Sequence, residues 1–321
     1  MLIKDFFKKF PDEASCRSHF KTQRDKQGVV CKRCNHTEHY WISTREQYHC
    51  KKCKYRTTLR SGTIMHGSRL PFYYWYFAMM LLGSTKKSFS ALSVQKQLGH
   101  KYYEPIWAML HKLRYAMADR DADYKLTDEM EIDEGFFAIV PEQEEREAIA
   151  EETKANDGKL KRGRGSQKKV PVLVIAESKP VEKTQKNKPN RAVGYIKMTH
   201  LADITKATIN DQVQNSIDKN AAVISDGANC YNDLQQKVKQ HQSVVIEDKK
   251  ESGKVLPWVH IAISNAKKLL LGIHHSIGKK YLQRYLDEFC YMFNRRFFDS
   301  VFDRLVIAAV ACNPNKIVQT K

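Results

Sequence analysis

Two Cys-x-x-Cys pairs near the start of the chain constrain its fold more than any other feature. They read CKRC and CKKC, with fifteen residues between them, and their thiols are Cys31, Cys34, Cys50 and Cys53. Each pair places two thiolates on one tight turn, and two such turns can close a tetrahedron around zinc. A reducing cytosol disfavours the alternative, a pair of disulfides. Because four thiolates leave no open coordination position, we expect a structural zinc ion.

The residues between the two pairs favour a small β domain. The segment HYWISTREQYHC has the strand character that the hairpins of a zinc ribbon require. His36, His39 and His49 could compete as ligands, but four thiolates already complete the site, so we expect surface histidines. We therefore predict a zinc ribbon with an N-terminal helix over residues 1–60.

Charge is the second constraint. The 321 residues include 55 Lys and Arg against 36 Asp and Glu, a formal charge of +19. This surplus favours a polyanionic partner, by attraction and by counterion release when phosphates are neutralised. The opening MLIKDFFKKFPDEASC lacks the apolar core of a secretory signal, and the most apolar run, residues 72–82, is too short to span a bilayer. We expect a cytosolic protein without a membrane role.

A helical segment follows the cysteine pairs. Residues 71–82 read as one apolar helix, and two further helices lie on either side of Gly99. The second of these has apolar residues at helical spacing, namely Ile106, Leu110, Leu113 and Met117. Two short helices about a glycine-bearing turn favour a helix-turn-helix, although any three-helix bundle gives this pattern. We predict a helix-turn-helix DNA-binding segment over residues 61–125.

The order of elements predicts a third domain over residues 126–310. Strand-like segments cover residues 130–140, 170–178, 191–201 and 221–228, and a helix over 205–217 precedes the last strand. Three strands, a helix, a fourth strand and later helices is the order of an α/β ribonuclease-H-like domain with a mixed central sheet. The chain is therefore expected to be multidomain, with the zinc ribbon and helix-turn-helix preceding this domain.

Two aspartates lie on the first and fourth strands of this domain, which are neighbours in a ribonuclease-H-like sheet. They are Asp133 and Asp226. Two carboxylates packed in one place repel unless a cation joins them, and oxygen ligands suit Mg²⁺ or Mn²⁺. Such sites activate a water or hydroxyl in phosphodiester chemistry. For either residue alone, a turn-capping aspartate is the alternative.

Residues 141–169, between the first two strands, have almost no large apolar side chains. An acidic half precedes a basic half, and such a segment cannot contribute to a core, so we expect a mobile loop. The basic half, Lys159 to Lys169, is either a phosphate-contacting arm or a solvated charge run.

Four segments together carry a resemblance to a known family. They are EIDEGFF, VISDGANCY, LPWVHIAISNAKKLLLGIHH and KYLQRYLDEFCYMFNRR. The chain resembles, from about residue 10 to about residue 300, bacterial insertion-sequence transposases of the DDE type, in the Asp-Asp-Asn/Lys branch related to the Merlin elements. The resemblance implies an N-terminal zinc ribbon, a helical DNA-binding segment and a ribonuclease-H-like catalytic domain.

The resemblance also implies a catalytic set. Carried over residue by residue, the first aspartate is Asp133, the second is Asp226, and the third position is Asn265, followed by Lys268. The Asn265 carbonyl oxygen could ligate Mg²⁺ as a neutral ligand, and Lys268 could contact the scissile phosphate. The alternative is that Asn265 and Lys268 are ordinary solvated helix positions.

Other carboxylates could compete for the third position. Glu134, beside Asp133, should point to the opposite side of its strand. Asp287 and Glu288 lie on a later helix that we expect to pack behind the site, and Glu288 stays open as the third ligand.

The resemblance implies a bacterial DNA transposase that binds the terminal inverted repeats of an insertion sequence and carries out Mg²⁺-dependent strand cleavage and strand transfer. We expect double-stranded DNA as partner, both element ends and target, and a homodimer or higher oligomer on that DNA. The expected location is the cytoplasm, with the nucleoid. The alternative is a non-catalytic DNA-binding protein or regulator derived from a transposase.

Overall fold

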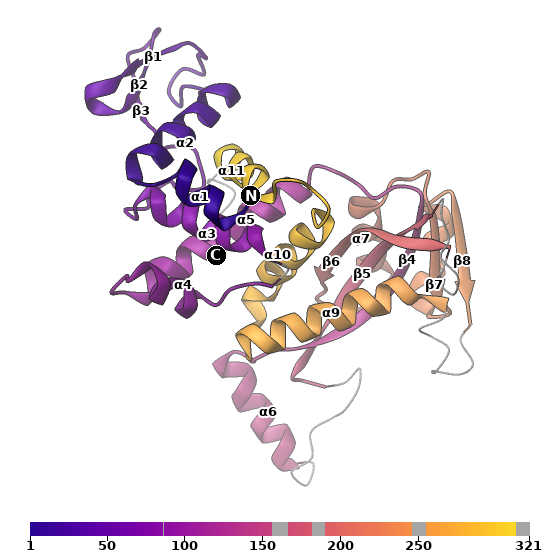
Figure 1. Cartoon of the computed structure of the whole chain (residues 1–321). Coiled ribbons are helices and arrows are strands. Elements are labelled where there is room, and N and C mark those ends of the chain that lie inside the picture. Colours follow the sequence, from indigo (N-terminus) through magenta and orange to yellow (C-terminus); the bar gives the residue numbers. More distant parts are fainter. Residues whose placement is uncertain (86, 156–165, 182–189, 246–254, 313–321) are drawn as a thin grey trace. The chain divides into compact units, whose positions relative to one another are not determined.

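The chain divides into two compact units, each with its own core. The computed structural model, drawn in Figure 1, describes residues 1–85, 87–155, 166–181, 190–245 and 255–312. Unit 1 is Met1–Asp121 together with the segment that begins at Arg295, and unit 2 is Ala122–Asn294.

Unit 1 opens with two helices, where the sequence predicted one, and with the small antiparallel sheet expected of a zinc ribbon. The helices are α1 (Ile3–Lys9) and α2 (Glu13–Gln27), and the strands in sheet order are β1 (His39–Ile42), β2 (Gln47–Cys50) and β3 (Arg56–Thr58). His49 differs from its prediction as a surface residue. It is buried, because β1 pairs with β2 and places the Tyr40 hydroxyl 3.1 Å from His49 Nδ1.

Three helices follow: α3 (Phe72–Ser84), α4 (Ala91–Leu98) and α5 (Tyr103–Asp121). α4 ends at Gly99, whose left-handed φ of 62° lets its N–H reach the carbonyls of the last helical turn. The predicted apolar residues of α5 are buried, which confirms two helices about this turn. α3 is the most apolar element, yet within the described part of the chain no helix combines the length and hydropathy needed to cross a bilayer.

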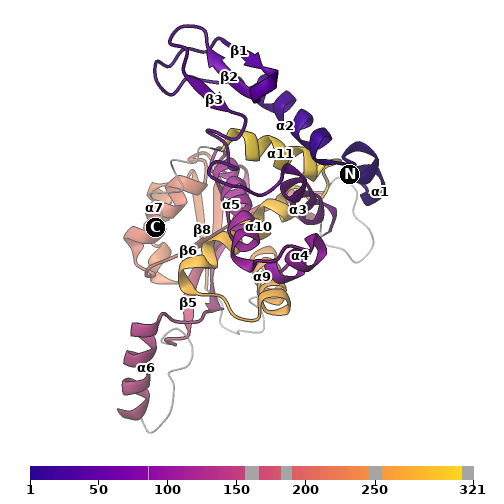
Figure 2. The ribbon, with the colours of Figure 1, turned by 90° about the vertical axis from the view of Figure 1, so that its left-hand side faces the viewer.

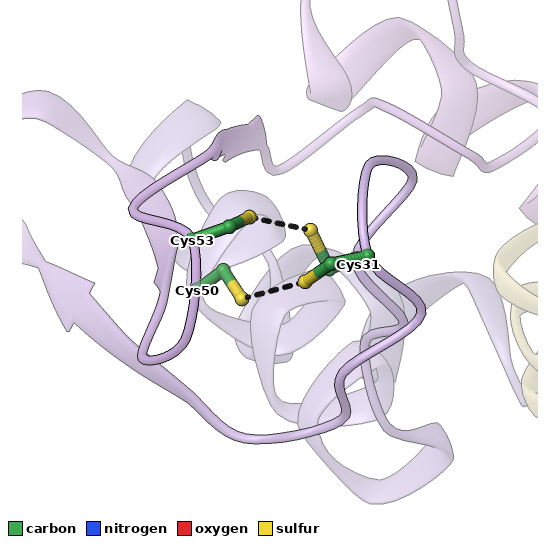
Figure 3. A group of neighbouring side chains, drawn as sticks. Cys31, Cys50 and Cys53 are labelled. Atoms are coloured by element: carbon green, nitrogen blue, oxygen red, sulfur yellow. Dashed lines mark hydrogen bonds between the residues drawn. The ribbon is translucent and has the colours of Figure 1, made fainter.

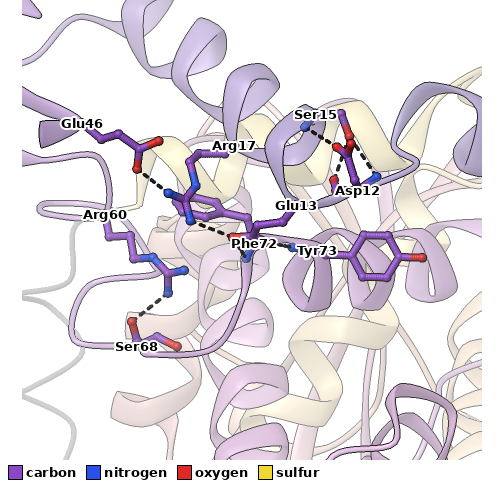
Figure 4. A network of polar contacts seen from close by, with 9 residues as sticks. All are labelled: Asp12, Glu13, Ser15, Arg17, Glu46, Arg60, Ser68, Phe72 and Tyr73. Atoms are coloured by element: carbon purple, nitrogen blue, oxygen red, sulfur yellow. Dashed lines mark hydrogen bonds and ion pairs between the residues drawn. The ribbon is translucent and has the colours of Figure 1, made fainter. Parts of the chain in front are cut away.

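A polar network joins α2 to the start of α3 (Figure 4). The two Glu13 oxygens accept the backbone N–H groups of Phe72 and Tyr73 at 3.0 and 2.8 Å. Arg17 donates to Glu13 and also to Glu46 of the ribbon. Because no side chain of α3 itself caps its first turn, the Glu13 carboxylate satisfies amides that would otherwise lack partners.

The last described helix, α11 (Val301–Ala311), lies in unit 1. The expected third domain, residues 126–310, would include this helix, but its apolar face packs against α2, α3 and α5. Gly83 of α3 permits a close approach, since a Cβ atom there would lie 3.1 Å from the Phe302 amide nitrogen. The boundary of unit 2 at Asn294 therefore differs from the expected domain end at residue 310.

Unit 2 contains a mixed five-stranded sheet in the order β6-β5-β4-β7-β8. The strands are β4 (Glu129–Ala138), β5 (Lys169–Pro180), β6 (Arg191–His200), β7 (Ala222–Asp226) and β8 (Gln240–Val244). β4, β5 and β6 are antiparallel neighbours, whereas β4, β7 and β8 run parallel. The predicted mixed sheet is confirmed, with the first and fourth strands adjacent. The sequence does not predict β8, because QHQSV at this edge is mostly polar.

Helices cover both faces of this sheet (Figure 2). On one face α7 (Lys206–Ser216) closes a core that includes Met130 and Ile132 of β4. On the other face α9 (Pro257–His274) and α10 (Leu282–Asn294) pack on a core that includes Phe137. Because side chains alternate along a strand, odd-numbered positions of β4 face α9 and even-numbered positions face α7.

A helix occupies the first half of the segment predicted to be a loop. α6 (Gln143–Ala155) is rich in Glu and Ala, residues that favour helices without needing a core to bury. The loop prediction is therefore wrong for this half. Residues 156–165, most of the basic half, lie outside the described residues, so the proposed phosphate contact stays a prediction.

Candidate functional site

Two aspartates come together on neighbouring strands of unit 2. The parallel pairing of β4 with β7 sets Ile132 opposite Ser225, and the next position along each strand is Asp133 and Asp226. Paired positions of parallel strands point to the same face, and neighbouring strands lie about 4.8 Å apart. Ile132 faces α7, so both carboxylates lie on the face that α9 covers.

Backbone amides orient both carboxylates. The N–H of Glu134 donates to Asp133 Oδ1 at 2.7 Å, and the N–H of Ala228 donates to Asp226 Oδ1 at 3.1 Å. Two carboxylates held in adjacent positions repel each other, and a cation between them relieves that repulsion. Carboxylate oxygens are the ligands that divalent cations such as Mg²⁺ prefer.

α9 brings a third group, His260, to the aspartates. Its Nδ1 lies 3.8 Å from Asp133 Oδ2, which is too long for a direct hydrogen bond. Burial lowers the pKa of His260, and the negative charge of Asp226 opposes part of that effect. The lowered pKa favours the neutral imidazole, which is the form that binds metal ions.

Lys267 lies two helical turns after His260 on the same side of α9. Its Nζ is 5.3 Å from the centroid of the Phe137 ring, which stands at another α9-facing position of β4. Burial and the charge of Lys169 lower the pKa of Lys267, whereas the charge of Asp133 raises it. A cationic side chain is thus placed within electrostatic reach of the carboxylates.

Asn265 and Lys268 are exposed and lie on other sides of α9. The buried stripe of this helix is Val259, Ala262, Ile263, Ala266 and Leu270. At about 100° per residue, Asn265 lies about 140° around the helix from His260, and Lys268 lies opposite the buried stripe. Asn265 and Lys268 therefore lie on other sides of α9 than His260, which faces Asp133, and Lys267, whose pKa the charge of Asp133 raises.

The rival carboxylates also lie elsewhere. Glu134 faces the opposite side of β4, as predicted, and accepts a hydrogen bond from Cys230 Sγ at 3.3 Å. Asp287 and Glu288 lie on α10, which packs on β6, and β5 separates β6 from β4. The helix expected behind the site therefore covers a different part of the sheet, and Glu288 is not favoured as the third group.

A signal for His260 is present in the sequence. The apolar spacing of α9 defines its buried stripe, and His260 and Lys267, seven residues apart, both border that stripe on one side. The spacing does not predict which of the two edges of the buried stripe faces the aspartates, because that depends on how α9 lies on β4. The choice between His260 and Asn265 therefore needs the tertiary structure.

The four cysteines of the two Cys-x-x-Cys pairs, all in unit 1, form a closed cluster (Figure 3). Their sulfur atoms all lie within 4.8 Å of one another, and the Cys31–Cys53 and Cys34–Cys50 sulfur distances are 3.5 and 3.6 Å. A tetrahedral zinc ion with Zn–S bonds of about 2.3 Å needs sulfurs about 3.8 Å apart. The cluster fits one structural zinc ion without a position for a substrate.

The two cysteine turns share one conformation. Asn35 and Lys54 follow them with left-handed φ values of 56° and 60°, and each donates its N–H to the first cysteine's carbonyl, at 2.9 and 3.1 Å. These turns also carry exposed basic residues, here called the knuckle cations: Lys32, Arg33, Lys51, Lys52 and Lys54. The zinc site thus presents a cluster of positive charge.

Removal of the zinc should unfold β1–β3, because the zinc–thiolate bonds join the two turns and metal binding supplies folding free energy. We expect metal analysis to find one zinc ion per chain, and chelation to raise amide exchange in residues 31–58 but not in the sheet of unit 2. Cys34→Ser should lose zinc, whereas Cys16→Ala, outside the cluster, should keep it. A zinc-free chain with protected ribbon amides would contradict this prediction.

Comparison with known proteins identifies two family domains in the chain. The family profile described as the ISXO2-like transposase domain matches residues 125–294, and the transposase zinc-ribbon domain matches residues 11–56. No curated protein and no solved structure matches the chain. The first match covers more than half of the chain and includes the strands and the helix that carry both aspartates and His260.

Proposed function

The chain belongs to the ISXO2-like transposase family, and from this premise we propose that it is a DNA transposase whose active site contains Asp133, Asp226 and His260. The observation that carries the proposal is the strand register that sets the two aspartates in adjacent positions, with His260 Nδ1 3.8 Å from one of them. In this proposal His260 takes the place that the resemblance gave to Asn265, and Lys267 the place of Lys268.

The donor set fits a divalent cation. Asp133 and Asp226 offer oxygens, and His260 offers a neutral nitrogen, with its Nε2 buried and unpartnered among the described residues. Carboxylates suit both Mg²⁺ and Mn²⁺, whereas an imidazole ligand is less suited to Mg²⁺, so Mn²⁺ fits the mixed set better. A bound cation would activate the attacking water or hydroxyl and stabilise the leaving oxygen.

The side chains and backbone of unit 2 would position the reacting groups. The amides of Glu134 and Ala228 keep the two carboxylates aimed at one point. Lys267 would hold its ammonium against a phosphate oxygen and offset the negative charge that develops there. The carboxylates and the Lys267 ammonium would already be in position before the reaction begins. These side chains would therefore need little movement during the reaction.

Unit 1 supports DNA as the partner. The knuckle cations are exposed on the zinc turns, where neutralising phosphates would release counterions and add affinity. Such contacts fix position along a duplex, and base contacts supply sequence preference. We propose that α4 and α5, the predicted helix-turn-helix, supply base contacts at the element ends. An element has two ends, so we also propose that at least two copies act together on DNA.

The experiment that tests this function is incubation of the full chain with labelled DNA carrying the inverted repeats that flank its gene. We expect cleavage at the element ends with Mn²⁺ or Mg²⁺, followed by strand transfer to target DNA, and no reaction in EDTA. Binding that falls steeply with salt should accompany it. Selective binding without cleavage in either metal would favour the non-catalytic regulator.

A further inference from the structure

We infer that Glu131 is a positioning residue that holds His260 at the active site, an inference that rests on the proposed function. Glu131 lies two residues before Asp133 on β4, on the side that faces α9. It is 4% exposed, and its Oε2 accepts the backbone N–H groups of Trp258 and Val259 at 2.7 and 3.1 Å. Those two residues immediately precede His260.

The start of α9 explains why this contact matters. The helix begins after Leu256 with Pro257, which has no N–H, and no side chain of α9 caps its first turn. The N–H of His260 bonds to the Leu256 carbonyl at 3.3 Å. Trp258 and Val259 therefore carry first-turn amides that no residue of the helix satisfies. The Glu131 carboxyl group supplies their acceptor. Burial raises the pKa of Glu131 to about 7, and the hydrogen bonds from the Val259 and Trp258 amides oppose part of that effect.

Later residues of β4 contact later residues of α9, so the helix runs alongside the strand in the same direction. A Cβ atom on Gly135 would lie 3.2 Å from the side chain of Ile263, so the absence of a side chain lets the helix approach the strand. Beyond it, Lys267 lies over Phe137. Successive α9-facing residues of β4 thus contact successive turns of α9. The Glu131 contact is the first of this series, and the contact between Asp133 and His260 is the next. Without the Glu131 contact, α9 can shift along β4 and move His260 away from both aspartates.

Glu13 offers a matched control elsewhere in the chain. It also accepts two backbone N–H groups, those of Phe72 and Tyr73, at the start of an uncapped helix, but it lies in unit 1. A general loss of helix capping should affect both glutamates alike. A positioning role predicts that only Glu131 affects the metal site.

The test compares two replacements of similar size in the full-length chain. Glu131→Gln keeps an oxygen that can accept both amides, whereas Glu131→Met keeps the volume and removes the acceptor. The readouts are Mn²⁺ affinity by electron paramagnetic resonance and single-turnover cleavage of the element-end DNA. Glu131→Met should weaken Mn²⁺ binding about tenfold and cleavage about a hundredfold. Glu131→Gln should stay within about threefold of the native chain in both, because it keeps the acceptor.

The controls separate this inference from simpler explanations. Glu13→Met should leave Mn²⁺ affinity native, and Asp133→Asn should abolish it. Should Glu131→Met fail to fold, Glu131→Asp replaces it, since the shorter side chain keeps a carboxyl group but cannot reach both amides. Native Mn²⁺ affinity in Glu131→Met, or equal losses in the Gln and Met variants, would overturn the inference. A native chain that binds Mn²⁺ but does not cleave DNA would instead overturn the proposed function.

Discussion

Asp133→Asn and Asp226→Asn should each lower strand cleavage by about a thousandfold or more while DNA affinity stays close to native. Each change swaps a charged oxygen ligand for a neutral amide of the same size. The asparagine Oδ1 can still accept the amide of Glu134 or Ala228, so the local fold should persist. Single-turnover cleavage in Mn²⁺ or Mg²⁺ measures the loss, and gel-shift assays in Ca²⁺ measure binding.

Glu134→Gln is the matched control for this pair. Glu134 is adjacent to Asp133 in sequence but faces the opposite side of β4, where Cys230 donates to it. Its amide variant should cleave DNA at a rate within about threefold of native, because it removes a charge that does not face the metal. Native cleavage in either aspartate variant would show that the reaction does not use this carboxylate pair.

His260→Ala should lower cleavage by about a hundredfold, whereas Asn265→Ala should leave it within about threefold of native. The reason is position: His260 faces Asp133 across 3.8 Å, and Asn265 is exposed on another side of α9. His260→Glu should cleave DNA faster than His260→Ala. It should also raise the cleavage rate in Mg²⁺ relative to that in Mn²⁺, since all of the proposed ligands are then oxygen atoms. Cleavage rates in both metals give the measurement.

Lys267→Ala and Lys268→Ala form a second comparison on the same helix. They are adjacent and equally charged, but Asp133 influences the pKa of Lys267, and Lys268 lies opposite the buried stripe. The Lys267 variant should cleave more slowly with unchanged Mn²⁺ affinity, and the Lys268 variant should be native in both. An inactive Asn265→Ala beside an active His260→Ala would return the third position to Asn265.

The zinc ribbon could be predicted from sequence because its determinants are local. The Cys-x-x-Cys spacing dictates the two turns, and the cysteine sulfurs gather within 4.8 Å as that spacing requires. The helices about Gly99 were predictable for the same reason, since a left-handed glycine ends α4 and an apolar repeat marks α5. The pattern of apolar residues could not reveal β8, because it is a polar edge strand. It could not reveal α6, because that helix is solvated.

The zinc cluster, the mixed sheet and the neighbouring positions of Asp133 and Asp226 follow from the sequence, whereas β8 and α6 do not. Element order predicts these neighbouring positions because adjacent parallel strands bring their side chains to a common face. The side of α9 that carries the group nearest Asp133, and the packing of the last helix in unit 1, emerge only in the folded chain. The physical reason is that the rotation and register of a helix on a sheet depend on contacts between distant residues. Glu131 with Val259 and Gly135 with Ile263 are such contacts, and His260, which lies between them on α9, has its Nδ1 3.8 Å from Asp133 Oδ2.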